Sequence, residues 1–152
     1  MLLKTGAFFG IIKPYQLAER GIIIMTIRES GEMYLETVYI LSQKSPTVRG
    51  VDVGAYMGYS KPSVSRAIGI LKRDGLVLTD EQGSIRLTEA GEAKAKIIYE
   101  RHKLLSQLLM NIGVDEKTAT EDACRIEHYI SETTFEAIKK HFKKYGSHQD
   151  ND

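Results

Sequence analysis

Apolar residues recur three and four positions apart through most of the chain, which is the pattern of amphipathic helices. Residues 30–43 follow this pattern and predict a first helix. The sequence Lys-Ser-Pro-Thr at 44–47 ends it, and residues 48–57 predict a second, shorter helix. Ser60 is the expected N-cap of a third helix, with Pro62 in its first turn, where a missing N–H costs little.

The third predicted helix is followed by two short strand-like runs, at residues 76–79 and 84–88. The sequence Asp-Glu-Gln-Gly separates them, so the pair predicts a β-hairpin. Helix, turn, helix and hairpin in this order indicate a winged helix-turn-helix, whose second helix enters the major groove of DNA. An ordinary solvated hairpin on a small α/β domain is the alternative interpretation.

The rest of the chain is predicted to be helical. One pattern runs from residue 88 to about residue 111, a second covers residues 115–130 without Pro or Gly, and Ser131 caps a last helix. These helices carry more apolar surface than a small winged helix can bury, which indicates a homodimer core. The basic run at 139–144 can contact DNA, but it is also typical of a solvated helix end.

Composition narrows the class of protein. The chain has 152 residues, of which 42% are hydrophobic, enough for one ordinary domain or two small ones. The formal charge of +1 requires any DNA affinity to come from a local patch. The single Cys excludes a disulfide framework and fits a reducing cytoplasm, where we expect the protein to reside. No apolar run approaches the roughly 20 residues of a membrane span, so no membrane partner is expected.

The two ends of the chain stand apart from the predicted elements. An apolar run at residues 6–12 resembles a signal-peptide core, but Lys13 and Pro14 end it and no small-residue cleavage site follows. Residues 1–24 are therefore treated as an extension of unknown role, and residues 146–152 as a disordered tail.

One short segment concentrates side chains that bind metals. Cys124, Glu127 and His128 stand at i, i+3 and i+4, so a helix places them on one face. Two other helical segments add donors: one carries Met33 and Glu36, and the other carries a lone His102. Helical proteins build metal sites in this way. The alternative is that Cys124 is a small buried hydrophobe and the others are solvated or packing residues.

The third predicted helix opens with small hydroxyls and long cations, which reach base edges and phosphates without lifting the helix off the groove. Arg66 is the first candidate for a base contact, and Arg86 of the hairpin is a candidate for a phosphate or minor-groove contact. The candidate DNA-binding residues are Ser60, Lys61, Pro62, Ser63, Ser65, Arg66 and Arg86.

These motifs resemble the diphtheria toxin repressor family of metal-dependent transcriptional regulators, which includes iron-dependent and manganese-transport regulators. The resemblance covers residues 26–143 and rests on the sequences EMYLETVY, KPSVS, DGLV, LTEAG, RHKLL and DACRIEH. It implies a mainly α fold: a winged helix-turn-helix DNA-binding domain with a small hairpin wing over 25–90, then a helical metal-binding and dimerisation domain over 91–145. Because the chain ends at Asp152, we expect the short form without a C-terminal SH3-like domain.

The resemblance also implies a ligand set that mixes two branches of the family. Met33, Cys124, Glu127 and His128 match the iron-type ligands, whereas Glu36 and His102 match manganese-type ligands. Ser106 and Thr120 replace the carboxylate and histidine of an iron-type second site, so that site is not expected. The manganese branch carries Asp and Glu where this chain has Met33 and Cys124, which argues against manganese specificity.

Ligand chemistry ranks the candidate metals. A thiolate, a thioether and imidazoles favour softer or borderline ions, so Fe²⁺ is favoured and Mn²⁺ is second, with Zn²⁺, Co²⁺ or Ni²⁺ able to bind in vitro. The implied function is a metal-dependent repressor, not an enzyme, that binds a double-stranded DNA operator as a homodimer and controls metal-uptake genes. Two alternatives stay open: a winged-helix regulator of a small organic ligand, and a thiol or metal enzyme using Cys124 and His128.

Overall fold

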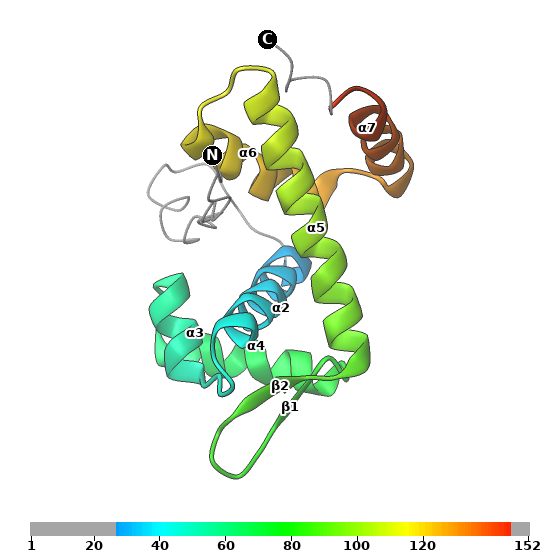
Figure 1. The fold of residues 1–152 in the computed structure, drawn as a ribbon. Helices are drawn as coiled ribbons and strands as arrows, with labels where there is room; N and C mark the ends of the chain where they lie inside the picture. The colour runs from blue at the N-terminus through cyan, green and yellow to red at the C-terminus, as the bar shows by residue number, and fades with distance from the viewer. Residues whose placement is uncertain (1–26, 147–152) are drawn as a thin grey trace. The chain divides into compact units, whose positions relative to one another are not determined.

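The computed structural model describes residues 27–146, so the predicted extension at 1–24 and all of the predicted tail at 146–152 except Gly146 lie outside the described residues. Within these residues, six helices and two short strands follow one another in the order α2 (Ile27–Lys44), α3 (Gly50–Met57), α4 (Lys61–Arg73), β1 (Val77–Thr79), β2 (Ile85–Leu87), α5 (Glu89–Asn111), α6 (Glu116–Tyr129) and α7 (Glu132–Tyr145) (Figure 1). The predicted mainly α fold is confirmed.

The described residues form two compact units, which divide within α5 between Glu100 and Arg101. The first unit comprises residues 27–100 and the second unit residues 101–146. The sequence instead places a domain boundary at residues 90 and 91, near the start of the same helix, and that boundary stays a prediction. None of the helices in residues 27–146 combines the length and the apolar composition that a bilayer crossing requires.

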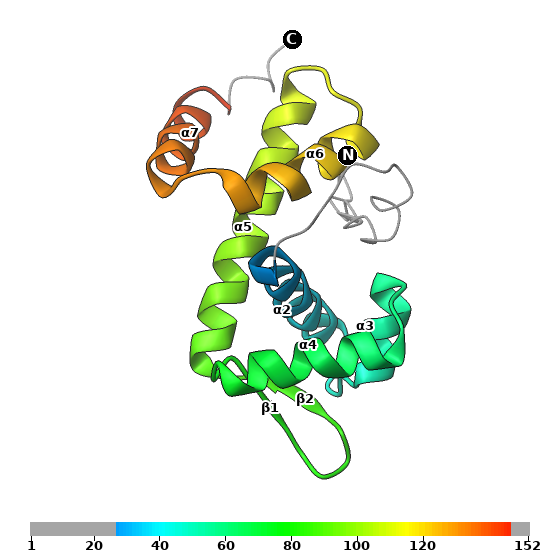
Figure 2. The ribbon, with the colours of Figure 1, turned by 180° about the vertical axis from the view of Figure 1, so that it is seen from behind.

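In the first unit, α2, α3 and α4 pack on one another, as the view from behind shows (Figure 2). Each helix contributes apolar side chains from one face to a common core, as the spacing in the sequence predicts. The most deeply buried of these side chains are Leu35, Val38, Val53, Met57, Val64 and Leu71.

The turn between α3 and α4 is the predicted helix-turn-helix. Gly58 adopts a left-handed conformation (φ 72°), and its N–H donates to the Gly54 carbonyl to end α3. Ser60 caps α4 by accepting the Ser63 N–H at 3.4 Å, and Pro62 stands in the first turn. The predicted cap and proline position are therefore confirmed.

The hairpin consists of β1 and β2, paired antiparallel with Thr79 opposite Ile85. Each strand has three residues, fewer than the sequence suggests. The Ile85 N–H donates to the Val48 carbonyl at 2.7 Å, and Arg49 forms an isolated antiparallel bridge with Ser84. The predicted wing is thus present, and its second strand is anchored to the backbone that leads into α3.

The start of α5 packs closely against the turn that precedes β1. Thr88 donates its hydroxyl to the Gly75 carbonyl at 2.6 Å and accepts the Gly91 N–H at 3.0 Å. A Cβ atom at Gly91 would lie 1.8 Å from the Leu76 carbonyl oxygen, so only glycine fits this approach.

The second unit contains the end of α5 with α6 and α7, and both α6 and α7 begin with a side-chain cap, of which only Ser131 is predicted from the sequence. Asp115 accepts the Thr118 N–H at 3.0 Å to begin α6, and Ser131 accepts the Thr134 N–H at 3.2 Å to begin α7. Phe135 is the buried anchor of α7. The apolar core of this unit includes Leu105, Ala119, Ala123 and Phe135.

Candidate functional site

Three of the predicted metal ligands meet on one face of α6. The Cys124 thiol, a Glu127 carboxylate oxygen and a His128 ring nitrogen all lie within 4.8 Å of one another. The side chains of Glu127 and His128 are 0% and 4% exposed, and Cys124 is also buried. The i, i+3, i+4 spacing in the sequence thus produces the convergence that it predicts.

The Glu127 carboxylate lies between two imidazoles. One oxygen is 2.9 Å from His102 Nδ1, which comes from α5, and the other is 3.3 Å from His128 Nε2. The side chains of His102 and Glu127 have no exposed surface. A carboxylate that accepts a ring proton fixes the tautomer and orientation of a histidine, as in metal sites where the other ring nitrogen is a ligand.

The donor set of the second unit fits a divalent transition metal. Metal–ligand bonds of about 2.0–2.3 Å place two donors of one ion no more than about 4.6 Å apart. The upper limit of 4.8 Å found here therefore requires only a small movement of side chains to share an ion. A thiolate, a carboxylate and imidazoles are ligands that Fe²⁺, Co²⁺ and Zn²⁺ accept.

The two remaining predicted ligands belong to the first unit. Met33 and Glu36 stand one helical turn apart on α2 and are 4% and 2% exposed. Burial, and next the charge of Glu36, raise the pKa of Tyr56 on α3 to about 12. The pKa of Tyr99 is raised mainly by burial, and further by its neighbours Tyr39 and Glu36. The ring centroids of Tyr99 and Tyr39 are 5.5 Å apart. These phenols are protonated at neutral pH.

The predicted DNA-binding side chains lie on the surface of the first unit. Arg66 points from the face of α4 opposite the buried Val64 and Ile68, and Arg86 is exposed on β2 opposite Leu78. All seven predicted residues are exposed: Ser60, Lys61, Pro62, Ser63, Ser65, Arg66 and Arg86. The Ser60 and Ser63 hydroxyls also bond each other at 2.9 Å, so part of this set stabilises the helix end.

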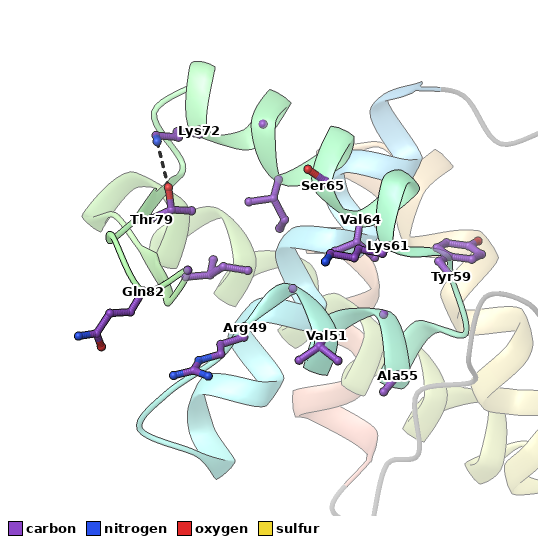
Figure 3. A pocket seen from close by; sticks show the side chains of 16 residues that line it. Arg49, Val51, Ala55, Tyr59, Lys61, Val64, Ser65, Lys72, Thr79 and Gln82 are labelled. Atoms are coloured by element: carbon purple, nitrogen blue, oxygen red, sulfur yellow. Dashed lines mark hydrogen bonds between the residues drawn. The ribbon is translucent and has the colours of Figure 1, made fainter.

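A groove of about 850 Å³ lies between α3, α4 and the hairpin (Figure 3). Lys61 and Ser65 of the predicted set line it, whereas Arg66 and Arg86 do not. Its lining adds Arg49 and Lys72, which sequence reasoning missed. Both cations line the groove beside residues of the hairpin, and helical spacing alone does not indicate that neighbourhood.

Family models match almost all of the described chain. Residues 26–84 match the iron dependent repressor, N-terminal DNA binding domain, and residues 88–151 match the iron dependent repressor, metal binding and dimerisation domain.

Several characterised proteins are similar over most of this chain. The diphtheria toxin repressor of Corynebacterium diphtheriae is 31% identical over 76% of this chain and 51% of its own length. The transcriptional regulator MntR of Escherichia coli is 32% identical over 79% of this chain and 77% of its own length. The iron-dependent repressor IdeR of Mycobacterium tuberculosis is 33% identical over 68% of this chain and 46% of its own length. The chain thus spans about half the length of the first and third of these relatives.

Solved structures with the same fold include the manganese regulator SloR and the IdeR of T. acidophilum. SloR has 30% sequence identity and a TM-score of 0.68, and the match covers 74% of this chain and 53% of SloR. The T. acidophilum protein has 25% identity and a TM-score of 0.66 over the same shares of the two chains. The match to such regulators confirms the predicted architecture of a winged helix-turn-helix followed by a helical domain.

Proposed function

Because the chain belongs to the iron-dependent repressor family, we propose that it is a transcriptional repressor whose affinity for operator DNA rises when a divalent transition metal binds. The observation that carries this proposal is the buried group of Cys124, Glu127 and His128 in a chain that also folds a winged helix-turn-helix. The family is one of transcriptional repressors rather than enzymes.

Six side chains would hold the metal. His102, Cys124, Glu127 and His128 supply donors from the second unit, and we assign Met33 and Glu36 as the further ligands. Their burial, their spacing of one helical turn and their match to ligand positions of the family support this assignment. When bound, the ion supplies positive charge and directed bonds that stabilise the arrangement of the chain in which all its donors meet.

Fe²⁺ is the proposed corepressor and Mn²⁺ the second choice. The relatives include both an iron-dependent repressor and a manganese regulator, so kinship alone does not rank the two metals. Ligand chemistry does rank them, because Cys124 and Met33 offer sulfur donors, whereas the harder Mn²⁺ prefers oxygen donors. A repressor that is activated by its metal suits genes for uptake of that metal, and it would work in the cytoplasm, where the DNA is and the thiol stays reduced.

Metal and DNA binding are linked in this proposal. An allosteric coupling of about 1–3 kcal/mol corresponds to a change in DNA affinity of about 5- to 150-fold. The same factor applies to metal affinity when DNA is present, because the coupling is reciprocal.

The test is anaerobic fluorescence anisotropy of the full chain on duplex DNA from upstream of its own gene. DNA affinity is measured with chelator and then with Fe²⁺, Mn²⁺ or Zn²⁺. We expect the affinity to rise with metal, and His128→Ala to lose that rise while Glu116→Ala, an exposed position on the same helix, keeps it. Equal affinity in all conditions would contradict the metal-dependent mechanism and favour a winged-helix regulator of an organic ligand.

A further inference from the structure

We propose that the groove between α3, α4 and the hairpin receives one sugar–phosphate strand of duplex DNA, with Arg49 and Lys72 contacting phosphates from its two sides. The inference rests on the proposed function and extends it. It assigns the backbone strand to a defined groove and names two contacts outside the predicted recognition residues.

The charges around the groove favour a polyanion. Its lining includes three cations, Arg49, Lys61 and Lys72, and no Asp or Glu among the sixteen described residues that form it. The whole chain carries a formal charge of only +1, so the positive charge is concentrated locally. Duplex DNA presents about one negative charge per 1.7 Å of its axis, which makes its backbone the natural complement of such a surface.

Arg49 is held by a fixed backbone. Its N–H donates to the Asp52 carboxylate at 2.8 Å, and its backbone bridges to Ser84 of the hairpin. The side chain itself is exposed. A cation on an anchored backbone loses less conformational freedom when it binds a phosphate than one on a mobile loop.

Lys72 stands on the other side of the groove and ties α4 to the hairpin (Figure 3). Its ammonium donates to the Thr79 hydroxyl at 2.9 Å. An ammonium has three N–H donors, so this bond positions the charge and still leaves capacity for a phosphate oxygen.

The α3 residues that line the groove are small and apolar. Val51 is 73% exposed, and it lies beside Ala55 along α3 (Figure 3). On the α4 side, a Cβ atom at Gly69 would meet nothing within 4 Å. A wall of this kind allows the apolar edge of a deoxyribose to approach closely while the cations reach the flanking phosphates. Burial of Val51 against the sugar would then add a hydrophobic contribution.

The charge arm of the test measures the salt dependence of DNA binding by the full chain, with and without metal, on the duplex from upstream of its own gene and on a second duplex of unrelated sequence. Each phosphate contact contributes about 0.9 to the slope of log affinity against log salt concentration. Arg49→Gln and Lys72→Gln are each expected to lower the slope by about 0.9 and to weaken both duplexes by the same factor. Lys96→Gln, an exposed lysine of α5 that does not line the groove, is the control and should leave the slope unchanged.

The steric and electrostatic arm places a carboxylate in the groove. Ala55→Glu at this exposed helix position is expected to weaken binding of both duplexes by on the order of tenfold or more, because like charges would then face each other. Ala93→Glu makes the same change at an exposed position of α5 outside the groove and should retain the affinity of the wild type. Unchanged thermal unfolding would show that the variants fold.

The possible outcomes distinguish a failure of the groove assignment from a failure of the proposed function. If the wild type binds DNA in response to metal but the groove variants keep its affinity and slope, another occupant, such as a small anion or an acidic peptide, fills the groove. The proposal is then overturned and the function stands. A loss on only one duplex would overturn it in favour of base reading. If the wild type binds neither duplex, both the groove assignment and the proposed function fail.

Discussion

Glu127 is a fully buried carboxylate among the proposed ligands. Its carboxylate has no exposed surface and lies between His102 and His128, at 2.9 Å and 3.3 Å. A buried carboxylate is costly unless other groups compensate its charge. The neighbouring imidazoles and thiol therefore form one interdependent cluster, in which each side chain constrains the others.

Cys124 is expected to set the ranking of metals. Cys124→Ser replaces a soft thiolate with a hard hydroxyl, so affinity for Zn²⁺ and Co²⁺ should fall about tenfold or more, and affinity for Mn²⁺ much less. Competition against a fluorescent chelator measures both affinities. The thiolate-to-cobalt charge-transfer absorption gives a direct reading of the ligand and should disappear in the variant. An unchanged metal ranking, or an absorption band that persists, would remove Cys124 from the ligand set.

Arg66 is expected to read a base rather than a phosphate. Arg66→Ala should weaken binding to the operator by about 1–3 kcal/mol, the ordinary worth of a bidentate base contact. Metal affinity and binding to an unrelated duplex should change little, because Arg66 contributes neither a ligand nor a lining residue of the groove. Equal losses on operator and unrelated DNA, measured by anisotropy, would assign Arg66 to the phosphate backbone instead.

At the scale of elements, local signals were sufficient to predict the helices. The predicted caps Ser60 and Ser131 each accept a backbone N–H of the first turn, and apolar spacing identifies the buried faces. The anchoring of β2 to Val48 depends on residues far apart in sequence, so no period or cap indicates it. Arg49, which bridges to Ser84 of the hairpin, lines the groove at this long-range contact.

In the candidate site, too, some features follow from local sequence patterns and others depend on long-range packing. Cys124, Glu127 and His128 are close in sequence and share a helix, so their convergence follows from helical geometry. His102 joins them from α5, and a lone histidine in an apolar stretch gives no indication of which carboxylate it will meet. Its contact with Glu127 emerges from packing of helices, which sequence spacing does not encode.

The junction between α5 and the turn before β1 requires glycine. Gly91→Ala would press its Cβ atom against the Leu76 carbonyl, so we expect a loss of about 1–3 kcal/mol or more in the free energy of unfolding. Gly31→Ala on α2 is the matched control, because nothing lies within 4 Å of its Cβ position. That change should stabilise the protein by about 0.5–1 kcal/mol through helix propensity. Urea unfolding measures both, and a stable Gly91→Ala variant would contradict the close approach.

The cap of α6 should contribute a pH dependence. Hydrogen bonds from Thr118 lower the pKa of Asp115 below its ordinary value of 3.8. A carboxylate with a lowered folded pKa adds stability above the unfolded pKa and loses it as pH falls through the folded value. Asp115→Asn keeps a good cap without a titrating group. The melting temperature of the wild type relative to this variant should therefore fall on acidification below about pH 3.8. A constant difference between the two proteins across this range would exclude the linkage.

At the scale of the whole molecule, the second unit exposes apolar side chains that a lone chain would leave in water. Ile112 and Tyr129 are 72% and 70% exposed. Large exposed apolar side chains on one helical unit are typical of an interface. The match of this region to a metal binding and dimerisation domain supports the proposal that a second copy covers them. Operator binding would then use two recognition helices at once.

Two substitutions test this assembly. Ile112→Glu and Tyr129→Glu each place a charge on the proposed interface, so the population of dimer in sedimentation velocity should shift to monomer at equal concentration. Leu78→Glu on the hairpin, where the side chain is 59% exposed, makes a matched change in the first unit and should leave the mass of the sedimenting species unchanged.

The monomeric variants should also bind operator more weakly than the wild type, because one chain occupies only one half-site. Metal binding at Cys124, Glu127 and His128 should persist, since those donors come from a single helix of a single chain. A wild type that sediments as a monomer with metal and operator present would overturn the dimer and the two-helix mode of DNA binding together.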